Sequence, residues 1–383
     1  MDDDRDLQAV LRLIHAGGAA APRRALLSMP GGPASALDAG PAVWRAAGLD
    51  ARQCALLAGD APDIDRWHDW LTATSARQLI AWHDPDYPAL LRRMSAPPLA
   101  LFVEGDVARL WRAGIAVVGS RAPTVGGRDN AATFARRFAV AGFAVVSGLA
   151  SGIDAAAHAA ALDADGDTVA VLGSGIDQPY PRSNTRLHAR IVGTGTVVSE
   201  YPPGTPARRE QFPSRNRIVA GLALGTLVVE AAHRSGALIT ARLAADAGRE
   251  VFAIPGSIHN PMARGCHRLL RDGATLVETA EEVIDALAAI AAGLADALQG
   301  RLCAPIQRGK TIPAVPAEQQ ASPSSDGDPD YHRLWNALGH DPTGMDELIS
   351  RSGLTVARAS AMLLSMELDG RVAAAHGRYS RKS

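Results

Sequence analysis

One unit recurs along the middle of this 383-residue chain: a short run of β-branched and apolar residues, a loop that often carries Gly or Ser, and then an Ala-rich helical stretch. Six strand-like runs of this kind lie at 115–118, 144–146, 168–172, 197–198, 227–229 and 250–254. Strands that alternate with helices of this length pack as a parallel sheet with helices on both faces, because right-handed crossovers leave no other simple arrangement. The sequence therefore predicts an α/β fold with a Rossmann-like parallel sheet at its core.

Composition divides the chain into four parts. Residues 1–72 carry short helical periods broken by prolines, which predicts a small helical bundle, either a packing or partner module or a DNA-binding hairpin element. Residues 73–299 hold the sheet and end in an amphipathic helix. Residues 300–329 are rich in Pro, Ser, Gln and Asp, which is typical of a flexible linker. The order helix, turn, helix, hairpin over 330–383 predicts a winged helix.

Charge and cysteine content exclude several classes of protein. The formal net charge is −1, so the chain is no polycation and any nucleic-acid site must be local. Cys54, Cys266 and Cys303 lack metal-ligand spacing, which indicates a reducing compartment and no structural zinc. We therefore expect a cytoplasmic protein with no metal site. Because no apolar stretch is long enough to span a bilayer, we expect no membrane association.

Gly- and Ser-containing turns follow several of the predicted strands. The turns concerned are Gly119-Ser120-Arg121, Ser147-Gly148, Gly173-Ser174 and Ser235-Gly236-Ala237. The carboxyl ends of parallel strands meet at one edge of a sheet, where helix N-termini attract anions, so these turns predict a phosphate-binding surface. Glycine is common in any such turn, and a purely structural role is the alternative. Neither a dinucleotide fingerprint nor a P-loop is present, so no cofactor is expected.

An Arg-rich segment, which we expect to be a loop, lies at 208–217. Four arginines stand there against one glutamate, giving about +3 inside a near-neutral chain. The segment also contains Phe212, next to Arg215, Asn216 and Arg217. A base stacked on an aromatic ring, with arginines on the phosphates, is how proteins hold single strands without reading sequence. The segment thus predicts a single-stranded nucleic acid as ligand, and a Phe212 that only caps the sheet edge is the alternative.

Several other polar residues have competing interpretations. Asp154 opens a helical stretch, where a helix cap is the first expectation and organisation of the neighbouring loops is the alternative. His158 is expected to pack within an Ala-rich helix. His233 is either a phosphate contact or a surface residue. No Ser/His/Asp or Cys/His set follows from the spacing, so no catalytic residue is assigned.

The segments AVVGSRAPT, VSGLASGIDAAAH, VAVLGSGID..YP..N, SEYPPG, FPSRNRIVAGL, VVEA..RSGALITA, VFAIPGS and GCHRLLRDGA together resemble the DNA-processing protein A family (DprA, also called Smf) of bacterial natural transformation. They occur in the family's order between about residues 84 and 285. The resemblance implies an extended Rossmann fold, a preceding helical SAM-like domain and a following winged helix. It also implies a homodimer that binds and protects single-stranded DNA, loads RecA recombinase onto it, and is not an enzyme.

The family's binding residues carry over onto matching positions. The resemblance places Arg121, Ser147, Gly148, Arg215, Asn216, Arg217 and Ser235-Gly236-Ala237 along the phosphate path, with Phe212 near a base. Relatives often have Lys where Arg208 or Arg209 stands, and Asn where His267 stands. The family's dimer contact corresponds to about 268–277.

The candidate recognition helix of the winged domain, 355–369, has Arg358 as its only basic residue against two acidic ones. This charge is unfavourable for reading DNA, so a partner-binding or regulatory role is the better interpretation.

An enzyme is the alternative function. The Gly225-Thr226 pair followed by Glu230 resembles the nucleotide phosphoribohydrolases of the lysine-decarboxylase-like Rossmann group, in which a comparable glutamate is catalytic. Those enzymes normally carry Pro-Gly-Gly just before it, whereas this chain reads Gly-Leu-Ala-Leu from Gly221. A scaffold without affinity for nucleic acid is a third possibility.

Overall fold

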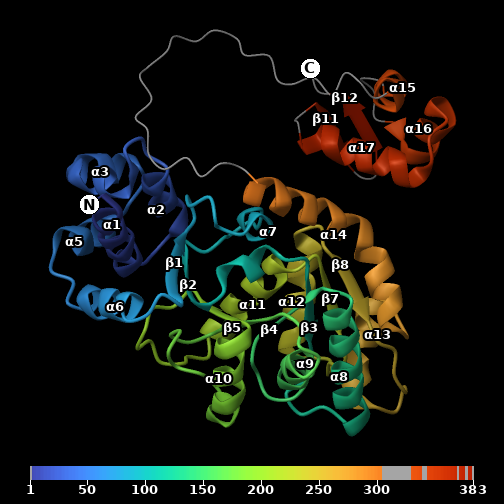
Figure 1. Cartoon of the computed structure of the whole chain (residues 1–383), viewed down its shortest axis with the longest axis horizontal. Helices are drawn as coiled ribbons and strands as arrows, with labels where there is room; N and C mark the ends of the chain where they lie inside the picture. Colours follow the sequence, from blue (N-terminus) through green and yellow to red (C-terminus); the bar gives the residue numbers. More distant parts are fainter. Residues whose placement is uncertain (1, 304–328, 339–342, 369–370, 376–377, 382–383) are drawn as a thin grey trace. The chain divides into compact units, whose positions relative to one another are not determined.

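The structure is a computed structural model that describes residues 2–303, 329–338, 343–368, 371–375 and 378–381 (Figure 1). Its contacts divide the chain into two compact units, 1–305 and 306–383. The helical N-terminal part and the sheet belong to the first unit. Most of the expected linker, 300–329, lies outside the described residues. At its start, helix α14 (Ala280–Cys303) continues through Gly300, although Gly in a helix costs about 1 kcal/mol relative to Ala.

A nine-stranded sheet forms the centre of the first unit, in the order β1-β2-β6-β5-β4-β3-β7-β8-β9. Its strands are β1 (Arg77–Ala81), β2 (Ala100–Gly105), β3 (Gly114–Val118), β4 (Ala144–Ser147), β5 (Thr168–Leu172), β6 (Thr196–Ser199), β7 (Gly225–Val228), β8 (Glu250–Ala253) and β9 (Thr275–Leu276). Strands β3 to β9 pair in parallel, whereas β2 pairs antiparallel with both β1 and β6. The six predicted runs are β3 to β8, and the predicted parallel core is confirmed.

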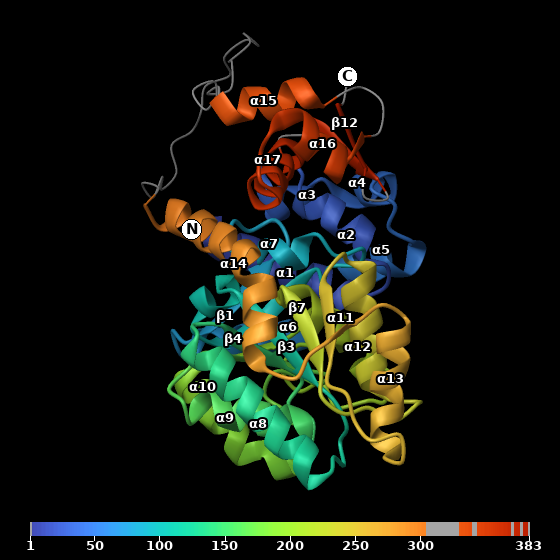
Figure 2. The same cartoon turned by 90° about the vertical axis from the view of Figure 1, so that its right-hand side faces the viewer.

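Helices cover both faces of this sheet (Figure 1, Figure 2). One face packs against α7 (Ala89–Arg92), α11 (Gln211–Leu222), α12 (Gly236–Asp246) and α13 (Arg264–Arg271), and the other against α8 (Val125–Val140), α9 (Ile153–Leu162), α10 (Thr185–Thr194) and α14. In β5 every residue is buried, since Val171 packs with Ile218 of α11 and the next residue, Leu172, packs with Ile191 of α10. Short 3₁₀ turns lie at η1 (Val107–Trp111), η2 (Arg182–Asn184) and η3 (Pro261–Ala263).

Six helices precede the sheet and pack beside β1 and β2. They are α1 (Asp2–Ala16), α2 (Ala20–Leu27), α3 (Gly32–Asp38), α4 (Gly40–Ala46), α5 (Ala51–Ala58) and α6 (Asp63–Thr72). Asp50 begins α5 with a capping box, because its side chain accepts from the Gln53 amide and the Gln53 side chain accepts from the Asp50 amide. Trp67 and Phe102 belong to one buried cluster, so these helices share their core with the sheet.

The second unit has its own apolar core. It contains α15 (Pro329–Ala337), β10 (Thr343–Gly344), α16 (Met345–Ser352), α17 (Val356–Leu368), β11 (Val372–Ala375) and β12 (Arg378–Arg381). Leu334, Leu348, Leu363 and Met366 are buried together, and the three strands form a sheet in the order β10-β12-β11. This arrangement confirms the predicted winged helix. Across the described parts of both units, no helix is long and apolar enough to cross a membrane.

Candidate functional site

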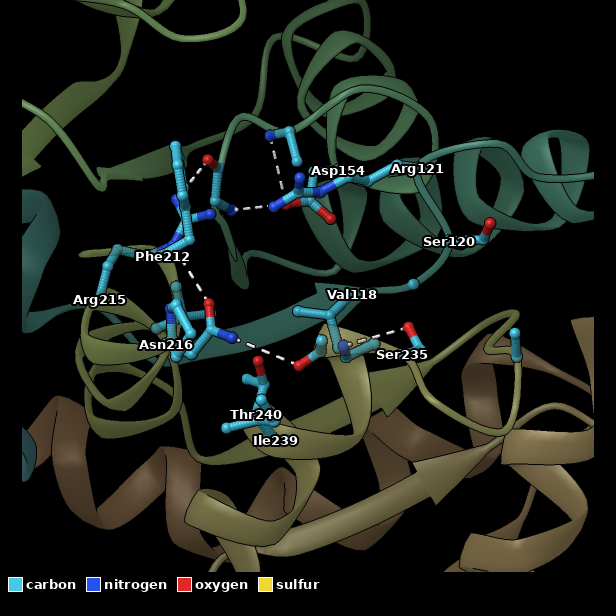
Figure 3. Close-up of a pocket in the computed structure, with 18 of the residues that line it drawn as sticks. Val118, Ser120, Arg121, Asp154, Phe212, Arg215, Asn216, Ser235, Ile239 and Thr240 are labelled. Atoms are coloured by element: carbon cyan, nitrogen blue, oxygen red, sulfur yellow. Dashed lines mark hydrogen bonds between the residues drawn. The ribbon is translucent and has the colours of Figure 1, made fainter. Parts of the chain in front are cut away.

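The strand order defines where a ligand is expected. From β3 the chain builds β4, β5 and β6 on one side, and from β7 it builds β8 and β9 on the other. Neighbouring strands whose connections leave in opposite directions form a switch point, and ligands bind beyond the carboxyl ends of such strands. A cavity of about 890 Å³ opens there, between the loops that follow β3 and β7 and the first turns of α11 and α12 (Figure 3).

The cavity brings together most of the residues that the sequence singled out. Those that line it are Gly119, Ser120, Arg121, Gly148, Phe212, Arg215, Asn216, Ser235, Gly236 and Ala237. Ser235 begins α12, since its side chain accepts from the Ala237 amide at 3.3 Å. The N-terminus of this helix, with its positive dipole end, therefore lies in the cavity wall.

Four expected residues do not line the cavity. Ser147 is fully buried and its hydroxyl donates to the Val117 carbonyl at 2.7 Å, which ties β4 to β3. Ser174 is buried and donates to the Gln178 carbonyl. Gly173 lies under the Phe212 ring, where a Cβ would come within 2.9 Å of the ring. Arg217 pairs with Glu200 at 2.5 Å.

Of the segment 208–217, which was expected to be an Arg-rich loop, residues 211–217 instead form the start of α11, while 208–210 precede the helix. Pro213 does not prevent this, because proline is tolerated in the first turn of a helix. The helical period determines which side chains of α11 face the cavity. The residues that line it are spaced i, i+3, i+4 and i+7: Phe212, Arg215, Asn216 and Val219. Arg217 lies outside this face.

Arg215 is a buried part of the cavity wall, with only 4% of its surface exposed. Its guanidinium donates to the carbonyl oxygens of Gly148 and Val171. A Cβ at position 148 would collide with this guanidinium, so a larger residue there would displace Arg215 from its place in the wall. Burial lowers the pKa of Arg215 to about 10, while the Asp154 carboxylate opposes the shift. Arg215 therefore stays charged near neutral pH.

Asp154 organises the loop after β4, which was the alternative interpretation of this residue. Its carboxylate accepts from the amides of Gly148 at 3.2 Å and Ala150 at 3.3 Å. Burial raises the pKa of Asp154, and the charge of Arg215 opposes that rise. Between these two amides, the buried Leu149 adopts a positive φ of 56°, a conformation that a non-glycine residue keeps only when its surroundings hold it. The loop is therefore firmly positioned.

The open side of the cavity carries the exposed charge. Arg121, Arg209 and Arg234 are exposed and line it, whereas Asp154 is the only carboxylate among its lining residues. The Arg121 guanidinium lies over the Phe212 ring, 5.4 Å from its centre. The Tyr180 ring also contacts the Phe212 ring. The cavity thus offers cations and aromatic surface side by side.

Sequence reasoning missed several of the lining residues, among them Tyr180, Arg234 and Thr240. Tyr180 belongs to the YP..N motif, which was noticed but given no role. Arg234 lies next to Ser235, and its position beside a predicted phosphate turn was the available signal. Thr240 lies one turn into α12, and no sequence pattern marks it.

Glu230, the possible catalytic residue of the enzyme alternative, is 7% exposed and does not line the cavity. Its carboxylate accepts from the amide and hydroxyl of Thr124, at 2.8 and 2.6 Å, and from Asn260 at 3.2 Å. It lies against Gly127 in the first turn of α8. These contacts give Glu230 a structural role, because they hold the start of α8 in place. Within the described ranges, no group of three potential metal ligands is present.

The chain matches known protein families and relatives. A family model described as DNA recombination-mediator protein A matches residues 78–288, and one described as the DprA winged helix domain matches 316–378. Protein Smf of Escherichia coli K12 is 39% identical over 313 residues, which cover 82% of this chain and 79% of that protein.

The chain is also similar to solved structures, two of which are DNA processing proteins. DNA processing protein A from Streptococcus pneumoniae superposes with a TM-score of 0.62 at 33% identity, covering 73% of this chain and 97% of that one. A Helicobacter pylori DNA processing protein A, described for its mode of binding single-stranded DNA, gives a TM-score of 0.50 at 28% identity, covering 55% of this chain and 95% of that one. The nine-stranded core, the winged helix and these matches together show that the chain belongs to the DNA recombination-mediator protein A family, also known as DprA or Smf.

Proposed function

We propose that this chain binds single-stranded DNA in the cavity beyond β3 and β7, protects it, and delivers it to recombination during natural transformation. The observation that carries the proposal is the convergence of three exposed arginines, an aromatic ring and a helix N-terminus on one cavity. The single-strand binding described for the similar Helicobacter pylori protein supports the same ligand.

In the proposed complex the phosphates follow the cationic rim. Arg121, Arg209 and Arg234 neutralise phosphate charge, and the amides at the start of α12 donate to phosphate oxygens. Arg215 acts indirectly: its guanidinium donates to main-chain carbonyls and so fixes the Gly148 loop in the cavity wall. Phe212 supplies a face on which a base stacks.

The ring explains the proposed preference for a single strand. In a duplex the base faces are stacked inside the helix, so an aromatic side chain reaches them only after unstacking. An unpaired strand presents its base faces to Phe212 at no such cost. Because stacking and phosphate contacts read no sequence, binding is expected to be tolerant of base composition.

No chemical step is part of this proposal. Glu230, the carboxylate that an enzyme would need, is taken up by Thr124 and Asn260. Incubation with nucleoside monophosphates should therefore release no free base. Release that disappears in Glu230→Gln would favour the enzyme alternative instead.

A salt titration with fluorescent oligo-dT, compared with a duplex of equal length, tests the binding proposal. We expect the protein to bind the single strand more tightly than the duplex, with affinity falling steeply as salt rises. Equal binding of both ligands, or no salt-dependent binding, would refute it.

Loading of RecA recombinase onto the bound strand is a further part of the proposal and comes from the family resemblance. The test measures ATP hydrolysis by RecA on single strands already coated with a single-strand-binding protein. We expect the chain to stimulate hydrolysis, and Arg121→Ala to reduce the stimulation because the strand is held less tightly. No stimulation by the unaltered chain would remove this part while leaving DNA binding intact.

We also propose a homodimer formed through α13 and β9, within 268–277. Among the residues that the structure describes, β9 is the edge strand of the sheet and no strand lies on its outer side, where Leu276 is 50% exposed. Leu276→Asp should convert a dimer to a monomer in analytical ultracentrifugation, because a charge would be buried in the contact. Ile258→Asp, which alters an equally apolar residue that is 75% exposed elsewhere, is the matched control. A dimer that persists in Leu276→Asp would place the contact elsewhere.

A further inference from the structure

Tyr180 is an aromatic residue of the cavity that has no part in the function proposed so far. It lies in the loop after β5, within the YP..N motif, and 47% of its surface is exposed. Its ring centre is 5.2 Å from that of Phe212, with 44° between the ring planes. An exposed ring adds little to the core, so packing alone does not account for its position.

The loop that carries Tyr180 is held at both ends. On one side, the Gly204 amide donates to the Asp177 carboxylate at 2.7 Å. On the other, the Asn184 side chain donates to the Leu149 carbonyl at 3.0 Å. The exposed ring is therefore presented at a defined place beside the cavity.

Phe212 is the less accessible of the two rings. It is half-buried, with Tyr180 against it and the Arg121 guanidinium over it. The two rings touch, so a base cannot enter between them, since that would require van der Waals separations of about 3.5 Å on each of its faces. The most open aromatic surface of this pair belongs to Tyr180.

We infer that Tyr180 is a second base-binding residue, and that Tyr180 and Phe212 form a platform for two successive nucleobases of a single strand, with the Arg121 guanidinium moving from the Phe212 ring to a phosphate when the strand binds. This inference rests on the proposed function, because it divides the same cavity into a cationic rim for phosphates and an aromatic side for bases. Stacking depends on the base face, so the platform accepts any base.

The competing explanation is that Tyr180 only shields Phe212 and supports the fold. The two explanations predict different results when the Tyr180 ring is removed and the DNA strand has no bases. A stacking residue matters only when the strand carries bases, whereas a structural residue matters for every strand that enters the cavity.

The experiment measures binding of two strands of equal length, oligo-dT and its fully abasic counterpart, to the intact chain and its variants. Tyr180→Ala should weaken oligo-dT binding by about 5- to 150-fold, with an unchanged salt slope, and leave abasic binding unaltered. Tyr180→Phe keeps the ring and should retain the binding of oligo-dT. Arg121→Ala is the matched comparison, because losing a phosphate contact should weaken both strands and lower the salt slope. Thermal unfolding of Tyr180→Ala checks that the fold is kept.

The outcomes separate the two proposals. An unaltered chain that binds neither strand would end the proposed function, and the platform with it. Strong oligo-dT binding that Tyr180→Ala leaves unchanged, or an equal loss on both strands, would overturn the platform alone. As a second readout, strands containing 5-iododeoxyuridine should form a photochemical cross-link at Tyr180, and cross-links confined to other residues would count against it.

Discussion

Arg121 and Arg215 both line the cavity, but their burial gives them different roles. Arg121 is exposed and can meet a phosphate directly. Arg215 is buried, and its Nη1 donates to the Gly148 and Val171 carbonyls. Sequence reasoning treated both as phosphate contacts, because the sequence carries no sign of which arginine a helix turns inward.

Arg121→Ala should weaken oligo-dT binding and lower the slope of log affinity against log salt by about one unit, because one phosphate contact is lost. Fluorescence anisotropy over a salt series measures both quantities. Arg242→Ala is the matched control, since it removes the same charge from a side chain that is 85% exposed and does not line the cavity. Equal changes in the two variants would indicate a general charge effect and not a site.

His158 makes stability depend on pH. It is fully buried, its Nδ1 lies 2.7 Å from the Thr168 hydroxyl, and burial together with the Arg215 charge lowers its pKa to about 3. The unfolded chain takes up a proton near pH 6.5 and the folded chain does not, so the contribution of His158 is present above that pH and lost as pH falls toward 3. The loss approaches roughly 5 kcal/mol in the limit.

Denaturant titrations between pH 4 and 7 test this. Below pH 6 the free energy of unfolding should fall with decreasing pH in both proteins. The slope should be smaller in His158→Gln than in the unaltered chain, by about 1.4 kcal/mol per pH unit. His233→Gln, at an exposed position, should keep the original slope. Parallel curves for His158→Gln and the unaltered chain would mean that this residue does not set the acid limit.

At the scale of elements, strands β3 to β8 were predictable because each lies in a short apolar run that is mostly buried. β9 was not, because its two residues, Thr275 and Leu276, are exposed and give no such signal. The start of α11 was also missed, since Phe-Pro and clustered arginines are typical of loops. Most of the predicted turns lie together because the carboxyl ends of parallel strands meet at one edge of a sheet, which alternation of strands and helices implies. The orientation of side chains such as Ser147 depends on packing that no turn motif encodes.

The helical face of α11 gives a prediction that charge alone does not. Phe212→Ala should weaken oligo-dT binding by about 1–3 kcal/mol with little change in the salt slope. Arg217→Ala should leave the affinity nearly unchanged, although it removes a positive charge five residues away, because that side chain pairs with Glu200. Isothermal titration calorimetry gives both affinities. A loss for Arg217→Ala as large as that for Arg121→Ala would return Arg217 to the phosphate path.

At the scale of the whole molecule, the two units have separate apolar cores. In the second unit, Arg358 of α17 is 2.7 Å from Asp330, so the basic residue of the candidate recognition helix is engaged within its own domain. A chain ending at residue 303 should therefore fold and bind oligo-dT within about threefold of the full chain at one salt concentration. Anisotropy and thermal unfolding measure this, and a loss of tenfold or more would assign the winged helix a share in DNA binding.

The two borders of the large sheet are unlike. Within the described part of the chain, both β1 and β9 end the sheet, but β1 packs against the N-terminal helices whereas Leu276 of β9 is exposed. In the dimer proposed above, both subunits would pair through the same strip of β9 backbone, so one encounter would occupy that strip on both subunits. Such an assembly is self-limiting: it ends at a pair and leaves no template on which a filament of subunits could grow.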